Sequence, residues 1–189
     1  MHSKVVSAAD SRFASGQSAA QAHHSSFKFF SLSQLRKLRG CEQVAAVCYR
    51  IRSSGIEFLL VRTGSGHWTF PKGGVEPGLT HAQAAALEAF EEAGVHGRIE
   101  ETAFTRYIRR KHNRRSPRRE IATHAHLCEV SWLDEPREAD RDPGWFPAEK
   151  AKQRLQRDRT PDYAAELARV VDSAVIRIQR QLNRRRRVD

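Results

Sequence analysis

Residues 80–95 carry the clearest helix signal in the sequence. Thr80 and Gln83 fit a capping box, in which each side chain accepts a hydrogen bond from a free backbone amide at the helix start. Gly94 is placed for the left-handed conformation that often follows the end of a helix. A stripe of small residues consists of Ala82, Ala85, Ala86, Ala89 and Ala93. These features predict a helix that packs closely against a neighbouring element.

The same helix carries three glutamates at positions that cost it stability. Glu88, Glu91 and Glu92 are spaced three and four residues apart, so their carboxylates share one face and repel one another. They also lie in the last turns, where the helix dipole disfavours negative charge. Converging carboxylates suit a hard divalent cation, although three glutamates alone are more typical of a solvated acidic face. The surrounding sequence distinguishes between these two interpretations.

The segment that contains this helix resembles the Nudix box. In that pattern a glycine and five residues precede a glutamate, and seven more residues lead to Arg-Glu-apolar-any-Glu-Glu-any-Gly-apolar. Counted from Gly73, the glutamates Glu88, Glu91 and Glu92 and the glycine Gly94 all fall in register. Fixed positions spread over so long a segment make the resemblance specific, and the chain is identified as a member of the Nudix family.

Two positions depart from the box. Leu79 stands where the first glutamate is expected, and Leu87 stands where the arginine is expected. In the family these polar residues are thought to support the metal-binding glutamates. Exchange of a polar support for an apolar one can be neutral or stabilising when the replacement packs well. An inactive domain that only binds its ligand is the alternative.

The resemblance implies an α/β fold, the Nudix α/β/α sandwich, in which a mixed β-sheet lies between helices. It also implies an enzyme that hydrolyses acid anhydrides in phosphorus-containing compounds. Glu88, Glu92 and the backbone carbonyl of Gly73 would bind Mg²⁺ or Mn²⁺, which bridges to the substrate diphosphate and orients a water for attack. Glu91 is the implied catalytic base, with Glu92 as the alternative, and Glu129 is one of the acids elsewhere in the chain that could contribute.

The residues before the box indicate the substrate class. The lead-in at 70–74 looks like that of the branch that hydrolyses diadenosine polyphosphates and diphosphoinositol polyphosphates, and Arg118 and Arg119 are similar to it as well. Lys72, Arg118 and Arg119 are therefore expected to bind substrate phosphates. The alternative for each is a solvated loop residue that binds no phosphate. A nucleoside triphosphate or RNA 5′-end pyrophosphohydrolase also stays open, as does a degenerate, non-catalytic module that binds nucleotides or nucleic acid.

Strand-like and helix-like segments surround the box. Strands are predicted at 43–52 and 56–63 around a turn at 53–55, and at 99–110 and 119–132, while helices are predicted to begin near Pro147 and at Thr160-Pro161. The run 109–119 is predicted to be a basic connection. His124 and His126 alternate on a strand and share one face, where packing or substrate hydrogen bonding is favoured over metal ligation.

The composition divides the chain into three parts and limits its partners. Residues 1–40 form a flexible leader, 41–158 the Nudix hydrolase domain, and 159–189 a C-terminal helix with a basic tail. The net charge of +11 favours polyanions, namely a small-molecule polyphosphate substrate and, more weakly, nucleic acid bound by the basic segments. The three cysteines lack the spacing of a zinc site or a disulfide framework, and no apolar run is long enough for a membrane span. We therefore expect a cytoplasmic protein, with its oligomeric state left open.

Overall fold

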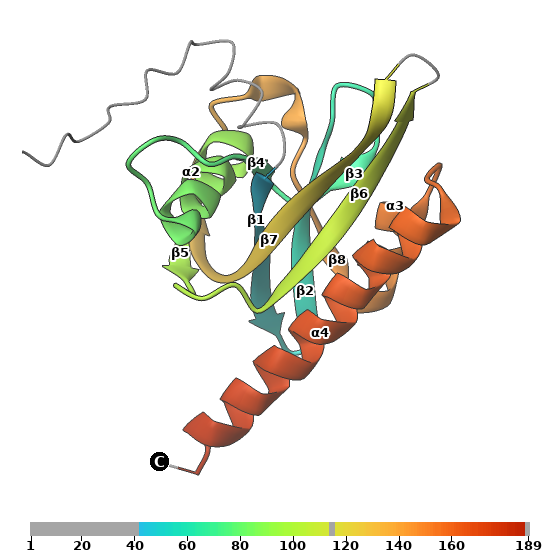
Figure 1. Ribbon diagram of the computed structural model, residues 1–189. Coiled ribbons are helices and arrows are strands. Elements are labelled where there is room, and N and C mark those ends of the chain that lie inside the picture. The colour runs from blue at the N-terminus through green and yellow to red at the C-terminus, as the bar shows by residue number, and fades with distance from the viewer. Residues whose placement is uncertain (1–41, 114–115, 188–189) are drawn as a thin grey trace, which may run out of the picture. The chain divides into compact units, whose positions relative to one another are not determined.

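The computed structural model describes residues 42–113 and 116–187, and the side chains of residues 111–119 lie outside that description. The predicted leader at 1–40 falls outside it as well. Within the described part, the centre of the fold is a mixed sheet of eight strands with the order β3-β2-β1-β7-β5, to which β4, β6 and β8 are paired at β1, β7 and β2 (Figure 1). The strands are β1 (Glu42–Arg52), β2 (Gly55–Arg62), β3 (Trp68–Thr69), β4 (Lys72–Gly74), β5 (Val95–Ile99), β6 (Thr105–Asn113), β7 (Ser116–Leu133) and β8 (Gly144–Pro147).

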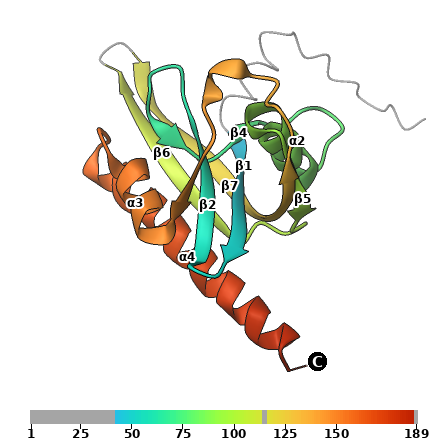
Figure 2. The same cartoon turned by 180° about the vertical axis from the view of Figure 1, so that it is seen from behind.

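Helices cover both faces of this sheet. α2 (His81–Ala93) lies on one face, while α3 (Ala148–Gln156) and α4 (Pro161–Arg185) lie on the other, as Figures 1 and 2 show from opposite sides. The α/β sandwich predicted from the sequence is confirmed. None of the helices within the described residues is long and apolar enough to cross a membrane.

Two apolar clusters fix these layers, because successive residues of a strand point to opposite faces of the sheet. On the α2 side, β1 and α2 contribute Val44, Ala46, Cys48, Ala84, Ala85, Ala89 and Ala93. On the α4 side, β1 and α4 contribute Ala45, Val47, Tyr49, Leu167, Val170, Val171, Ala174 and Ile178. Since the α2 contribution is made of alanines, the helix backbone can lie close to β1, and this closeness positions the glutamates of α2.

The ends of α2 follow the sequence prediction. The hydroxyl of Thr80 accepts a hydrogen bond from the Gln83 amide at 3.2 Å, and the Gln83 side chain accepts one from the Thr80 amide at 2.9 Å, which completes the capping box. Gly94 adopts the left-handed conformation with φ 63°, and its amide donates to the carbonyl of Phe90 at 2.8 Å. At α4, Thr160 precedes Pro161 as predicted, but its side chain makes no capping hydrogen bond.

The strands after the box differ from the prediction. A single strand over 99–110 is wrong, because β5 ends at Ile99 and β6 begins only at Thr105. Both strands pair with different parts of the long strand β7, and a bulge follows His96, where Gly97 lies against the backbone of Glu129. The predicted basic connection at 109–119 is also corrected, since β6 continues to Asn113 and β7 begins at Ser116.

The tight turn after α2 yields a test of the fold. A side chain at Gly94 would meet the backbone carbonyl of Asp134 and would require the left-handed conformation. We expect Gly94→Ala to lower the free energy of unfolding by at least about 1–2 kcal/mol, the cost of that conformation for a residue with a Cβ atom. Gly64→Ala is the matched control, because nothing lies within 4 Å of its Cβ position and its φ is not left-handed. Equal urea midpoints for the two variants would show that the turn is not under this constraint.

Candidate metal and substrate site

The carboxylate of Glu88 lies against the backbone of Gly73. Gly73 is in β4, which pairs with β1 so that Gly73 is opposite Val44. A Cβ atom at position 73 would overlap the carboxylate of Glu88, so this approach of α2 to β4 requires glycine. The structure thus brings together two of the three groups that were predicted to bind metal.

Glu92, the third predicted metal ligand, is held from two sides. Its residue is only 1% exposed. One carboxylate oxygen accepts a hydrogen bond from the backbone amide of Lys72 at 3.1 Å, and the other pairs with the guanidinium of Arg141 at 2.7 Å. Arg141 ends the short 3₁₀ helix η1 (Ala139–Arg141) and also pairs with Glu138 at 2.5 Å. Burial raises the pKa of Glu92, and the charge of Arg141 opposes that rise.

The acidic face of α2 is strongly destabilised in its ionised form. Burial, and after it the negative charges of Glu92 and Glu91, raise the pKa of Glu88 from 4.5 to about 7. The charge of the half-buried Glu91 is therefore close enough to Glu88 to raise its pKa. The charge of Glu92 has the same effect, so the three glutamates influence one another. Such a group of carboxylates gains most from a cation, which favours their ionised forms.

Cationic and aromatic side chains gather on the other side of Glu92. The positive charges of Arg109, Arg141 and Arg159 act on the ammonium group of Lys72, whose pKa is lowered chiefly by burial. The guanidinium of Arg159 donates to the carbonyl of Trp68 at 2.8 Å. It also lies 5.0 Å from the ring centre of Tyr163, and that of Arg109 lies 5.6 Å from the same ring. A cationic surface lined by aromatic rings is suited to a phosphate-bearing substrate.

Two groups in this surface are buried without a hydrogen-bond partner among the described residues. They are the hydroxyl of Tyr107 and Nε of Arg159. The rings of Tyr107 and Tyr163 lie 6.3 Å apart. Unpartnered buried donors are costly unless something else binds them. We call Lys72, Tyr107, Arg109, Arg159 and Tyr163 the cationic cluster.

The sequence analysis did not single out Arg141 or most of the cationic cluster. These residues come from β4, β6, η1, α4 and the connection between α3 and α4, and only the fold brings them together. Arg109 belonged to the basic run, but its spacing there did not distinguish it from its neighbours. The predicted substrate residues Arg118 and Arg119 lie at the start of β7, and their side chains are outside the described residues.

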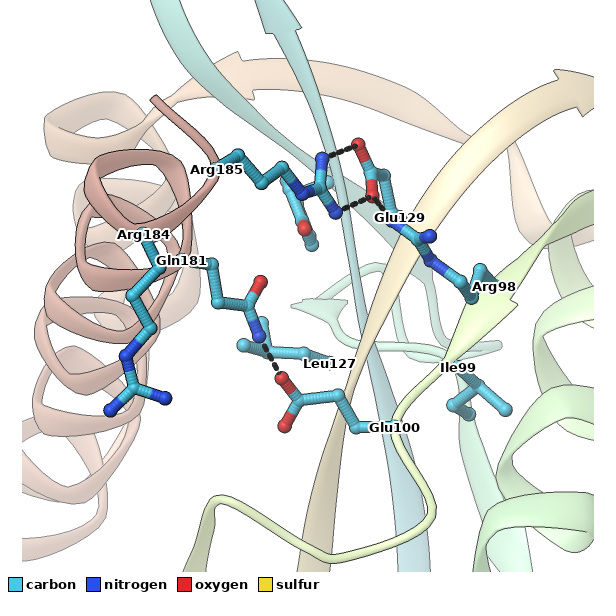
Figure 3. A pocket seen from close by; sticks show the side chains of 9 residues that line it. Arg98, Ile99, Glu100, Leu127, Glu129, Gln181, Arg184 and Arg185 are labelled. Atoms are coloured by element: carbon cyan, nitrogen blue, oxygen red, sulfur yellow. Dashed lines mark hydrogen bonds and ion pairs between the residues drawn. The ribbon is translucent and has the colours of Figure 1, made fainter. Parts of the chain in front are cut away.

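Glu129, considered as an additional acid, lies on the other face of the sheet. Its carboxylate pairs with Arg98 and, at 3.0 Å, with Arg185 of α4 (Figure 3). These residues line a cavity of about 320 Å³ between α4 and the sheet. Because both arginines pair with it, Glu129 belongs to an ion-pair network on the α4 side and is not part of the acidic face of α2.

Comparisons with known proteins concern the domain and its fold. A model of the NUDIX domain matches residues 42–168. The asymmetrical bis(5′-nucleosyl)-tetraphosphatase of Sus scrofa is 48% identical over 48 residues, which are 24% of this chain and 33% of that protein. The chain thus matches about a third of the length of this curated relative.

Solved structures share the fold. The binary complex of a C. elegans Ap4A hydrolase superposes with a TM-score of 0.55 at 21% identity, covering 74% of this chain and 98% of the other. The NUDIX domain of Shewanella oneidensis NrtR, complexed with ADP ribose, gives a TM-score of 0.55 at 18% identity over 73% and 88% of the two chains. At these identities the likeness shows the fold alone, and it agrees with the sheet and helix layers described above.

The raised pKa of Glu88 makes a prediction for metal-free protein. The folded state binds this proton more tightly than the unfolded state, so stability falls as the pH rises from about 4.5 to about 7. Glu88→Gln removes this loss, and its melting temperature should exceed that of the wild type by a margin that grows across the same interval. Thermal unfolding with a chelator present measures the margin, and Glu76→Gln controls for loss of an exposed carboxylate. A margin independent of pH would contradict the assignment.

Proposed function

The chain belongs to the Nudix family, whose domain model matches residues 42–168, and from this we propose that it is a metal-dependent pyrophosphohydrolase. The proposed reaction cleaves a diphosphate bond in a nucleoside-polyphosphate-type substrate. The observation that carries the proposal is the contact between Glu88 and the backbone of Gly73, with Glu92 fixed beside it by the amide of Lys72.

The groups at this site fit a hard divalent cation. Glu88 and Glu92 offer carboxylate oxygens and Gly73 offers a backbone carbonyl, which are the ligand types that Mg²⁺ and Mn²⁺ prefer. Burial and the charges of Glu92 and Glu91 raise the pKa of Glu88, so a bound cation would favour its ionised form. Mg²⁺ or Mn²⁺ bound there would neutralise diphosphate oxygens and hold a water in line with the bond to be cut.

Glu91 is the better choice for the catalytic base. Glu92 has one oxygen bound to the amide of Lys72 and the other to Arg141, and its remaining lone pairs are the ones proposed to bind the metal. Glu88 lies against Gly73. Glu91 is half-buried on the same helix and is left to take the proton of the attacking water.

The cationic cluster supports a substrate with several phosphates. Lys72 is in β4 next to Gly73, so its ammonium group can bind a phosphate that reaches the metal site. Arg109 and Arg159 extend the positive charge beyond it, and both guanidinium groups lie near the ring of the buried Tyr163. We favour a dinucleoside polyphosphate or a diphosphoinositol polyphosphate, with the substrate contacts of Arg118 and Arg119 as part of the same proposal. The cytoplasmic location and the weak nucleic-acid binding stay predictions.

A hydrolysis panel tests this function. The full chain is assayed with Mg²⁺ or Mn²⁺ against diadenosine polyphosphates, inositol pyrophosphates, nucleoside triphosphates, sugar nucleotides and 5′-triphosphate RNA. We expect metal-dependent turnover with the highest kcat/KM on the first or second class. Preferential turnover of nucleoside triphosphates or RNA would overturn the substrate assignment. Absence of metal-dependent hydrolysis across the panel would leave a binding module.

The role of Glu91 predicts a specific kinetic change. Glu91→Gln keeps the size of the side chain but cannot accept the proton, so kcat should fall by a factor on the order of 10² or more. KM and the apparent affinity for Mn²⁺ should change little. Glu76→Gln, at an exposed position before the helix, is the control. Turnover like that of the wild type would remove Glu91 from the mechanism.

Two adjacent glycines give a matched test of the metal site. A methyl group at Gly73 displaces the carboxylate of Glu88, whereas nothing lies within 4 Å of the corresponding position at Gly74. Gly73→Ala should therefore weaken Mn²⁺ binding and lower kcat/KM by at least about tenfold, which corresponds to loss of about 1.4 kcal/mol of transition-state stabilisation. Gly74→Ala should stay close to the wild type. Similar losses in both variants would mean that the loop, rather than the Glu88 contact, determines activity.

A further inference from the structure

Two histidines and a glutamate from three different elements meet at one end of α2. Glu42 begins β1, His81 is the first residue of α2, and His124 lies in β7. One carboxylate oxygen of Glu42 is 2.8 Å from Nε2 of His124 and 3.8 Å from Nε2 of His81. The two imidazole rings lie 4.8 Å apart, and the three potential ligand atoms are all within 4.8 Å of one another.

This cluster is separate from the acidic face of α2. His81 precedes Glu88 by seven residues along the helix, which is a displacement of about 10 Å along the axis. Glu42 likewise lies at the end of β1, two residues before Val44, whose register partner is Gly73. One ion cannot bind both sets of side chains, so the cluster needs an explanation of its own.

A simple ion pair explains only part of the cluster. An ion pair joins one imidazole to one carboxylate oxygen, and Nε2 of His124 already lies 2.8 Å from Glu42. His81 directs its Nε2 to the same oxygen at 3.8 Å, too far for a hydrogen bond. Convergence of two imidazole nitrogens and a carboxylate oxygen on one small volume is the arrangement that a shared cation favours.

His126 adds a second observation at the same place. It lies two residues from His124 on the same face of β7, and it is only 1% exposed. Its Nδ1 is 2.9 Å from the carbonyl oxygen of Glu100, which can only accept, so Nδ1 carries the proton. Nε2 of the neutral ring therefore has a free lone pair, and it is buried with no hydrogen-bond partner among the described residues. This unused nitrogen is on the same face of β7 as His124, and it is not one of the three converging ligand atoms.

We propose that Glu42, His81 and His124 form a second metal site, which binds a divalent transition metal such as Zn²⁺. Imidazole nitrogen suits Zn²⁺, whereas Mg²⁺ prefers oxygen ligands, so the site is chemically distinct from the one on the acidic face. Three protein ligands leave one position of a tetrahedral ion open. Side chains of the three residues are 51%, 38% and 25% exposed, so an ion can reach them from solvent.

The bound ion would link the beginnings of β1 and α2 to β7. Because it binds only the folded arrangement of these elements, it stabilises the fold by an amount that grows with the logarithm of its concentration above the dissociation constant. The site needs no catalytic step to be detected. Its existence is also independent of the proposed hydrolase activity.

Zinc binding to the tag-free full chain tests the proposal. Isothermal titration calorimetry is run with Zn²⁺ in the presence of saturating Mg²⁺, which occupies the acidic face. We expect one Zn²⁺ ion to bind tightly to each wild-type chain. The dissociation constant of this ion should be at least tenfold higher in His81→Ala and in His124→Ala. Zn²⁺ should bind with wild-type affinity to two controls, His67→Ala and the double variant Glu88→Gln with Glu92→Gln. Co²⁺ should give a visible absorption band that is lost in the two histidine variants.

Thermal unfolding supplies the second readout. Zn²⁺ should raise the melting temperature of the wild type and of His67→Ala, and it should leave that of His81→Ala unchanged. Because His81 lies at a partly exposed helix end, His81→Gln serves as a conservative second variant if the alanine variant unfolds. The proposal is overturned if Zn²⁺ binds the histidine variants as it binds the wild type. It is also overturned if no Zn²⁺ binds the wild type once Mg²⁺ occupies the acidic face.

Discussion

The carboxylate of Glu88 fills the space that a side chain at position 73 would occupy, so α2 and β4 can approach each other only with glycine there. This contact places the carboxylate of Glu88 against the backbone of residue 73. The same approach brings the amide of Lys72 to Glu92 at 3.1 Å. Both contacts depend on the alanines of α2, which let the helix backbone lie close to β1. The alanines that pack α2 against β1 and the residues that form the site therefore depend on each other.

That constraint has a cost in electrostatic free energy. Three carboxylates on one helical face repel one another, and burial raises the pKa of Glu88 to about 7. Arg141 and the amide of Lys72 compensate the buried Glu92, but no described contact compensates Glu88 in the same way. A fold selected only for stability would not keep this arrangement. Our proposal that the face binds Mg²⁺ or Mn²⁺ accounts for it, because the cation supplies the missing positive charge.

Local signals in the sequence predicted local structure well. The capping box at Thr80, the left-handed Gly94 and the hairpin between β1 and β2 all depend on residues that are close in sequence, and the structure confirms them. The division between β5 and β6 was missed, because it depends on which part of the distant strand β7 each segment pairs with. Arg141 and Arg159 were missed for the same reason, since their partners lie 49 and 91 residues away.

The central claim is that the acidic face of α2 binds a divalent cation against the backbone of Gly73. Crystals of the full chain grown with Mn²⁺, measured near the manganese absorption edge, locate the ion by its anomalous scattering. We expect the strongest anomalous peak within coordination distance of Glu88 and Glu92 and next to the Gly73 carbonyl. A fully occupied peak elsewhere in the chain, with none at these carboxylates, would contradict the account.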